Sequence, residues 1–224
     1  MIVTIDGTAS SGKSTIAKRL AKTLGFVYCN TGAIYRAMTL YILDNFGEEY
    51  FNEDAFYDLV KDMKITEGFN DGEFFITLNG ADVTNKINEP HISEMVAKYA
   101  KLPKLRTVVR AIQRQIATSN DSVVEGRDIG TVVFPGAEVK FFMSASDEVR
   151  AKRRMADFEK KGEHIPFNDV LKMIQERDRL DTEREISPLK PAVDAIIIDN
   201  SGNDPDEMVN KLASIVKSYK QTEN

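Results

Sequence analysis

The chain has 224 residues and a net charge of −5, and apolar residues make up 42% of it against 29% charged residues. This length and balance are typical of one folded domain with a full core and exclude a disordered or fibrous chain. The acidic balance argues against broad nucleic-acid binding, two histidines and one cysteine argue against a structural zinc site, and no apolar run approaches the roughly 18 residues of a membrane-spanning helix. Cys29 cannot form a disulfide within the chain and the first strand leaves no room for a signal peptide, so we expect a cytoplasmic protein without membrane or nucleic-acid partners.

The first predicted element is a strand at 2–5, which leads into a glycine-rich loop and a helix at 14–24. The loop matches the pattern G-x-x-x-x-G-K-[ST], in which backbone N–H groups and the helix N-terminus converge on phosphate oxygens. In this pattern Lys13 pairs with the β- and γ-phosphates, and Ser14 supplies a hydroxyl ligand for Mg²⁺. A plain turn between strand and helix is the alternative, with odds of roughly one in twenty. The residues expected to bind the nucleotide are Gly7, Thr8, Ala9, Ser10, Ser11, Gly12, Lys13, Ser14 and Thr15.

Short apolar runs alternate with helical patterns along most of the chain. Polar or turn residues bound each run, as expected for strands that are buried on both faces of a parallel sheet. The further strands are expected at 26–29, 122–125, 139–143 and 195–198, and the further helices at 33–45, 104–119, 147–161, 167–182 and 206–220. This order predicts an α/β fold with a five-stranded parallel sheet flanked by helices, which holds its ligand at the carboxyl ends of the strands.

The stretch from 64 to 84 breaks the alternation and predicts a small antiparallel β insert. Its strands are expected at 64–67, 73–78 and 81–84, with turns at Asn70-Asp71-Gly72 and Asn79-Gly80. We expect the insert to lie over the ligand site, although loops can mimic this pattern. The domain prediction is one domain over 1–224 that contains an insert at about 64–102.

Arginines gather at positions where this fold places loops and helix faces. Arg36 follows the second strand and Arg127 the third, while Arg150, Arg153 and Arg154 are spaced to share one helix face. Any single arginine has about even odds of forming only a surface ion pair. Guanidinium groups, however, grip phosphate through two parallel hydrogen bonds. The set as a whole therefore predicts a site for several phosphates.

Phosphoryl transfer explains this distribution, because its transition state spreads negative charge over oxygens that cations must stabilise. The segment 150–184 carries further arginines near its end and predicts a helical lid on the ATP side. A second cluster, formed by Arg36, Arg106 and Arg127, would hold an acceptor that is itself anionic.

Four segments of the chain together resemble one family. They are the P-loop at 7–14, TGAIYR at 31–36, GRDIGTVVFP at 126–135, and ERD at 176–178 followed by Arg184. These segments, in this order and over essentially the whole chain, resemble the bacterial-type cytidylate kinases. The resemblance implies a P-loop nucleoside monophosphate kinase whose insert covers the acceptor site and whose lid closes. It also implies transfer of the γ-phosphate of ATP, with Mg²⁺, to CMP or dCMP; these small molecules are the expected partners of a protein that we expect to be a monomer.

On the acceptor side, the resemblance implies a role for each matching residue. Thr31 and Arg36 would hold the acceptor phosphate, and Arg127 would also bind phosphate. Arg106 would contact the cytosine, and Asp128 would read the edge of the base.

In the lid, the resemblance places Arg153 near ATP and makes Arg177 and Arg184 bridges between phosphates. Asp181 would accept hydrogen bonds from ribose hydroxyls, although an i,i+4 ion pair with Arg177 is an alternative role. The residues predicted to be catalytic are Lys13, Arg127, Arg153, Arg177 and Arg184.

Two positions depart from the family pattern. Ala97 stands where the family often has a serine that meets the cytosine, and Glu125 stands where it often has an aspartate. We expect CMP to be preferred over UMP by a reduced margin, with Ser93 a weak substitute for the missing hydroxyl. Kinases for other acceptors (UMP, AMP, shikimate or dephospho-coenzyme A) and a non-catalytic nucleotide-binding regulator remain as alternatives. The intact Lys13 and the lid arginines argue against the regulator.

Overall fold

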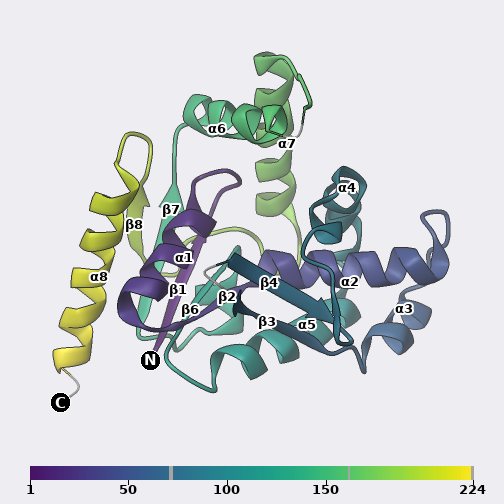
Figure 1. Cartoon of the computed structure of the whole chain (residues 1–224), viewed down its shortest axis with the longest axis horizontal. Helices are drawn as coiled ribbons and strands as arrows, with labels where there is room; N and C mark the ends of the chain where they lie inside the picture. Colours follow the sequence, from purple (N-terminus) through teal and green to yellow (C-terminus); the bar gives the residue numbers. More distant parts are fainter. Residues whose placement is uncertain (71–72, 161, 223–224) are drawn as a thin grey trace. The chain divides into compact units, whose positions relative to one another are not determined.

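The computed structural model describes residues 1–70, 73–160 and 162–222. Its main sheet has five strands in the order β2-β6-β1-β7-β8 (Figure 1). The strands are β1 (Ile2–Gly7), β2 (Val27–Asn30), β6 (Ser122–Gly126), β7 (Val139–Ser144) and β8 (Ile196–Asp199). β1 runs parallel to both β6 and β7, and β7 runs parallel to β8. The predicted α/β fold with a five-stranded parallel sheet is confirmed.

The chain divides into two compact units. The first unit comprises residues 1–26 and 122–224, and the second comprises residues 27–121. The glycine-rich loop and the arginine-rich helices belong to the first unit, and the β insert belongs to the second. Within the described ranges, no helix is both long enough and apolar enough to cross a membrane.

The core of the first unit fixes both ends of the glycine-rich loop. Val3 and Ile5 of β1 have no exposed surface. After the loop, α1 (Lys13–Leu24) buries Ile16 and Leu20 and contacts α8 (Pro205–Thr222). Because close-packed side chains resist displacement, the loop begins and ends at fixed points.

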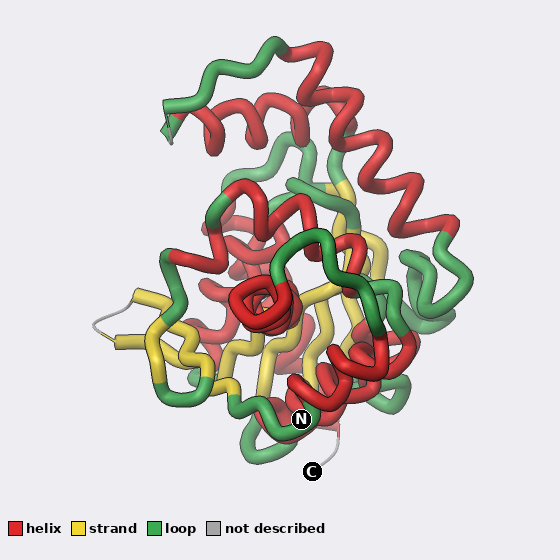
Figure 2. Tube along the Cα trace, turned by 90° about the vertical axis from the view of Figure 1, so that its right-hand side faces the viewer, coloured by secondary structure: helices red, strands yellow, loops and turns green. Residues whose placement is uncertain are grey.

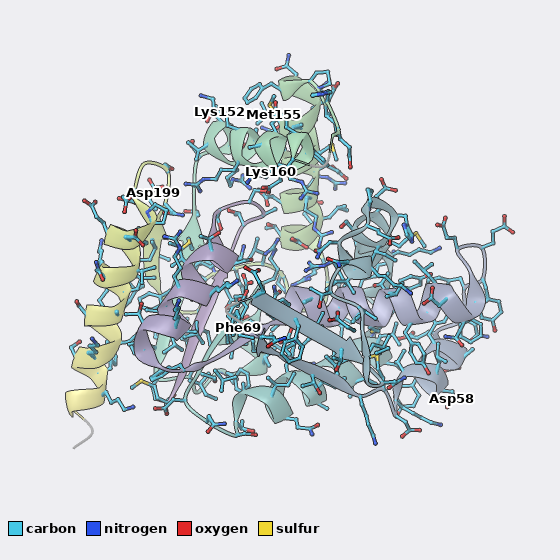
Figure 3. All side chains as sticks on the ribbon, in the orientation of Figure 1. Asp58, Phe69, Lys152, Met155, Lys160 and Asp199 are labelled. Carbon is cyan, nitrogen blue, oxygen red and sulfur yellow. The ribbon has the colours of Figure 1, made fainter. Side chains whose placement is uncertain are left out.

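Helices α6 (Asp147–Glu159) and α7 (Phe167–Glu183) pack side by side and appear as two adjoining red helices in Figure 2. Met155, labelled on α6 in Figure 3, packs against the cluster between them. The cluster consists of the buried residues Ala151, Phe158, Val170 and Ile174. The α6–α7 pair thus has a small apolar core of its own.

The second unit combines helices with the predicted antiparallel insert, which is confirmed as a three-stranded sheet in the order β3-β4-β5. β3 and β4 pair with Ile65 opposite Leu78. The elements of this unit, besides β2, are α2 (Thr31–Phe46), α3 (Glu53–Val60), β3 (Ile65–Asn70), β4 (Glu73–Leu78), β5 (Ala81–Asp82), η1 (Lys86–Asn88), α4 (Pro90–Tyr99) and α5 (Pro103–Ala117). The position of the insert over the acceptor site stays a prediction.

Besides the single turn η1, the sequence patterns missed three helical elements. α3 begins where the side chain of Asn52 accepts hydrogen bonds from the N–H groups of Asp54 and Ala55, and α4 begins at Pro90. The third is a π-helical turn, η2 (Ile129–Val133), in which Val132 and Val133 both donate to the carbonyl of Asp128. All three are short, so their apolar periodicity covers too few turns to stand out.

Some predicted boundaries also differ from the observed ones. β5 ends at Asp82 rather than at 84, because the N–H of Thr84 donates to Asp82 Oδ1 at 2.8 Å and turns the chain. Asp71 and Gly72 of one predicted turn, and Lys161 at the end of one predicted helix, lie outside the described residues.

Candidate active site

The glycine-rich loop turns sharply between β1 and α1 because several of its residues have positive φ. Gly7 (φ 150°) lies so close to Met143 that a Cβ atom would collide with its carbonyl oxygen, so only glycine fits. Gly12 (φ 91°) and Ser10 (φ 56°) provide the rest of the turn. The left-handed conformation costs a serine about 1–2 kcal/mol. Contacts from the surrounding structure must therefore hold Ser10 in place.

Lys13 lies at the start of α1 and is buried. Its Nζ donates to the carbonyl oxygen of Thr8 at 2.6 Å, which places the ammonium inside the curve of the loop. Burial, and after it the charge of Arg127, lowers the pKa of Lys13 to about 7. Phosphate oxygens bound in the loop would favour the charged form of Lys13, because their negative charge would offset the cost of burying the ammonium.

Ser14 and Glu125 place two hard oxygen ligands next to the loop. Ser14 Oγ donates to Glu125 Oε2 at 2.9 Å, and Glu125 is only 4% exposed at the end of β6. Hydroxyl and carboxylate oxygens are ligands that Mg²⁺ accepts in proteins, so this pair fits the ion. The sequence prediction named Ser14 alone. Glu125 could have been found as an acidic residue at the end of a buried strand whose neighbour, β1, leads into the loop.

Asp6 links the two loops that follow β1 and β6, and sequence reasoning also missed it. Its carboxylate accepts from the N–H of Ile129 at 2.8 Å and from that of Gly130 at 2.7 Å. Burial raises the pKa of Asp6 to about 6, against the lowering effect of these two hydrogen bonds. Asp6 thereby fixes the turn that follows Arg127 and Asp128.

Five of the predicted site residues are linked to one another around Asp181. We call them the Asp181 cluster, which consists of Arg127, Asp128, Arg177, Asp181 and Arg184. Asp181 Oδ2 accepts from Arg127 Nε at 2.9 Å and from Arg177 Nε at 3.3 Å. Arg184 lies 3.9 Å from Asp181 Oδ1 and 3.7 Å from Asp128 Oδ1. Burial raises the pKa of Asp181, but the three arginines outweigh it and hold the pKa below its ordinary value. The cluster thus contains three cations for two carboxylates.

Arg153 contacts the glycine-rich loop directly. Its Nη1 donates to the carbonyl of Ser11 at 3.1 Å and its Nη2 to the carbonyl of Asn200 at 2.8 Å. The Asn200 side chain donates to the same Ser11 carbonyl at 2.8 Å. Asn200, which the sequence analysis did not single out, follows β8. In the sheet, β8 is separated from β1 by β7, so Asn200 reaches the loop from the edge strand.

Arg150 and Arg153 both reach carbonyls of the glycine-rich loop, at Ala9 and Ser11, but the expected exposure of Arg150 needs a correction. Arg150 is only 3% exposed and does not lie on a solvated helix face. The guanidinium of Arg154 lies over the ring of Phe158, 4.6 Å from its centroid. Spacing alone could not separate these residues, because their surroundings come from distant parts of the chain.

The remaining predicted residues belong to the second unit. Thr31 is buried at the start of α2, and Arg36 lies on the same helix. Arg106, at 1% exposure, is not on the surface where we expected the arginines to lie. Its Nη1 donates to the carbonyl of Ala100 at 2.9 Å, and its guanidinium lies 5.6 Å from the centroid of the Tyr35 ring. These contacts hold the cation in one orientation within the unit.

Comparison with known proteins decides the family. The family model described as cytidylate kinase matches residues 3–218. The chain belongs to the cytidylate kinase family. The cytidylate kinase of Thermosipho melanesiensis is 45% identical over 96% of this chain and 96% of that protein, and the cytidylate kinase of Lactobacillus gasseri is 46% identical over 97% and 94%. The predicted family membership is confirmed, and the chain is a nucleoside monophosphate kinase by that membership.

Solved structures agree with the fold. A shikimate kinase from Bacteroides thetaiotaomicron has a TM-score of 0.51 over 97% of this chain and 98% of that one, at 12% sequence identity. At this identity the likeness supports the P-loop kinase architecture and says nothing of the acceptor.

Proposed function

We propose that the protein transfers the γ-phosphate of ATP to CMP or dCMP and releases ADP with CDP or dCDP. The observation that carries this proposal is the Asp181 cluster, in which three guanidinium groups gather within the unit that contains the glycine-rich loop. The family relatives named cytidylate kinase support the same reaction. In the cell, we propose a cytoplasmic monomer that acts on these small molecules.

The loop and α1 would bind the triphosphate of ATP. Backbone N–H groups of the loop after Ser10 and the N-terminus of α1 would surround the phosphate oxygens, and Lys13 would move from the Thr8 carbonyl to the β- and γ-phosphates. Ser14 and Glu125 would hold Mg²⁺ between them and the phosphates. When bound, the ion neutralises charge on the β- and γ-phosphate oxygens.

The Asp181 cluster would supply the cations for the transferring group. Arg127 would bind the acceptor phosphate, while Arg177 and Arg184 would bridge the two phosphates. Asp181 holds these three arginines together, and its oxygens would also accept from ribose hydroxyls. The alternative of an ion pair with Arg177 is compatible with this role, since Asp181 already makes that pair at 3.3 Å. Residues 150–184 would act as the lid, and Arg153 would face ATP from it.

The family resemblance assigns the recognition of the acceptor to a further set of residues. Thr31 and Arg36 would hold its phosphate, and residues 64–102 would form the monophosphate-binding insert. Cytosine offers an amine at C4 that the Asp128 carboxylate can accept from, and an acceptor at N3 that Arg106 can donate to. Uracil reverses both groups, so its C4 carbonyl would face the Asp128 carboxylate and its N3–H would face the Arg106 guanidinium, a mismatch that a polar site rejects strongly.

A single assay tests the acceptor. Release of ADP from ATP is measured with CMP, dCMP, UMP and AMP as acceptors at equal concentrations, with the Lys13→Ala variant as the control for contaminating kinases. We expect CMP and dCMP to give the highest kcat/KM, with UMP behind them. A preference for UMP or AMP would contradict the proposed acceptor, and ATP binding without turnover of any acceptor would favour a regulator.

A further inference from the structure

The glycine-rich loop has an unusual attachment at Ala9, one residue before the strained Ser10. Both backbone polar groups of Ala9, its N–H and its carbonyl, are held from outside the loop. The N–H of Ala9 donates to Asp178 Oδ1 of α7 at 3.3 Å, and its carbonyl oxygen accepts from Arg150 Nη1 of α6 at 3.1 Å. These two side chains also form an ion pair with each other, at 2.5 Å.

Arg150 itself is fixed by several further contacts. Its Nε donates to the carbonyl of Ala145, in the link between β7 and α6, at 3.0 Å. Its Nη2 pairs with Asp147, the first residue of α6, which in turn accepts from Gln175 of α7 at 3.0 Å. A buried guanidinium with so many partners has one orientation only. The position of the Ala9 peptide is therefore set by where α6 and α7 pack.

The attachment at Ala9 acts on the residue that needs support. Ser10 has a φ of 56°, a conformation that a serine leaves unless its neighbours prevent it. Asp178 and Arg150 hold the peptide on one side of Ser10, and Arg153 and Asn200 hold the Ser11 carbonyl on the other. The N–H groups after Ser10 can converge on phosphate only while this turn is kept.

We propose that the Arg150–Asp178 ion pair positions the glycine-rich loop for nucleotide binding by holding Ala9, and so keeps Ser10 in its strained conformation. Neither residue touches the phosphates in this account; both act through the loop backbone and are positioning residues. The pair also makes the loop conformation depend on α6 and α7, the helices of the proposed lid. The inference rests on the proposed binding of ATP, and it is independent of which acceptor is used.

The neighbouring pair on α7 provides a matched control. Glu176 and Arg179 form an exposed ion pair at 2.7 Å, two residues from Asp178. Glu176→Ala removes a carboxylate–guanidinium pair within α7 and leaves Ala9 held, whereas Asp178→Ala removes a pair between α7 and α6 together with the bond to Ala9. A difference between the two variants is therefore not caused by the loss of a carboxylate from α7 alone.

The test is the affinity for Mg²⁺–ADP, measured by calorimetry on the full chain. We expect Asp178→Ala to lower it about tenfold, because the Ala9 N–H and a buried guanidinium both lose a charged partner. Glu176→Ala should bind like the wild type. In steady state, Asp178→Ala should raise KM for ATP more than KM for CMP. Ser10→Gly, which makes the positive φ accessible without strain, should restore part of the lost affinity when it is added to the Asp178→Ala protein.

The thermal melting of each variant separates loss of binding from loss of fold. If Asp178→Ala does not fold, the test uses Asp178→Asn instead, which preserves the size of the side chain. We expect this variant to lose less ADP affinity. A folded Asp178 variant that binds ADP as tightly as the wild type would overturn the proposal, and so would a loss that Ser10→Gly leaves untouched. A wild-type protein that binds no ADP would instead overturn the proposed function.

Discussion

The charged side chains around the glycine-rich loop bond to the backbone of that loop. Those of the Asp181 cluster share one carboxylate, and their backbone contacts, from Arg127 to the Gly126 carbonyl and from Arg184 to the Ser187 carbonyl, lie outside the loop. Lys13, Arg150 and Arg153 donate to the carbonyls of Thr8, Ala9 and Ser11. Arg127, Arg177 and Arg184 instead share the carboxylate of Asp181. A side chain that holds backbone sets the shape of a loop and cannot leave without changing it. A guanidinium held by a carboxylate can exchange or share that partner with phosphate oxygens, because both present the same bidentate acceptor.

Lys13 is the exception in the first group, since it holds the loop through Thr8 and is also proposed to bind the phosphates. We expect Lys13→Ala to lower kcat by about 10³-fold, because it removes a cation placed where charge develops. Lys13→Arg should fail nearly as badly, since a planar fork does not fit the space of a compact ammonium beside Thr8. Steady-state kinetics on the folded variants measure both effects. Near-wild-type turnover of Lys13→Ala would contradict the assignment.

Arg127 tests the second group. Arg127→Ala should lower turnover with CMP by about 10²-fold, because the acceptor phosphate loses a charge-assisted partner. Arg36→Ala should behave alike, and both variants should keep ADP binding. Cytidine, which lacks the phosphate, should be a very poor acceptor for the wild type. Efficient phosphorylation of cytidine would show that no acceptor phosphate is gripped.

Asp6 also bonds to backbone, through the N–H groups of Ile129 and Gly130, and its bonds can be tested by their dependence on pH. Its pKa of about 6 in the folded protein exceeds the ordinary value of 3.8, so the folded state binds the proton more tightly. The contribution of Asp6 to stability is therefore fully present below pH 3.8 and is lost as the pH rises through 6, by up to about 3 kcal/mol. Asp6→Asn should remove this part of the pH dependence. Urea unfolding of both proteins between pH 4 and 8 measures it, and parallel pH profiles would exclude Asp6 as the titrating group.

A substitution at Ala97 should have the smallest effect on activity, because it adds only one hydrogen bond to the base. Ala97 and Ser93 are both half-buried on α4. Ala97→Ser should raise the preference for CMP over UMP by a factor of a few, equivalent to about 0.5–1.5 kcal/mol. The ratio of kcat/KM for the two acceptors measures it, with Ser93→Ala as the companion variant. An unchanged ratio in Ala97→Ser would place position 97 outside the base pocket.

The sequence predicted what depends on local pattern and missed what depends on distant contacts. The five strands and the antiparallel insert follow from runs of apolar residues and turn signals, which are local properties. The loop residues that are proposed to bind phosphate follow from a fixed spacing. Arg150, Asp178 and Asn200 were not assigned a role, because each meets the loop from more than 140 residues away. Nothing in the immediate neighbourhood of such residues distinguishes a buried, loop-holding arginine from one on a solvated face.

The comparison between the two groups is tested most directly by ADP affinity in two variants measured side by side. Arg127→Ala removes a member of the Asp181 cluster, and Asp178→Ala removes a support of the loop. We expect Arg127→Ala to bind Mg²⁺–ADP like the wild type and Asp178→Ala to bind it about tenfold more weakly. Equal affinities in the two variants, or a larger loss in Arg127→Ala, would contradict the division between side chains that shape the loop and side chains that meet the acceptor.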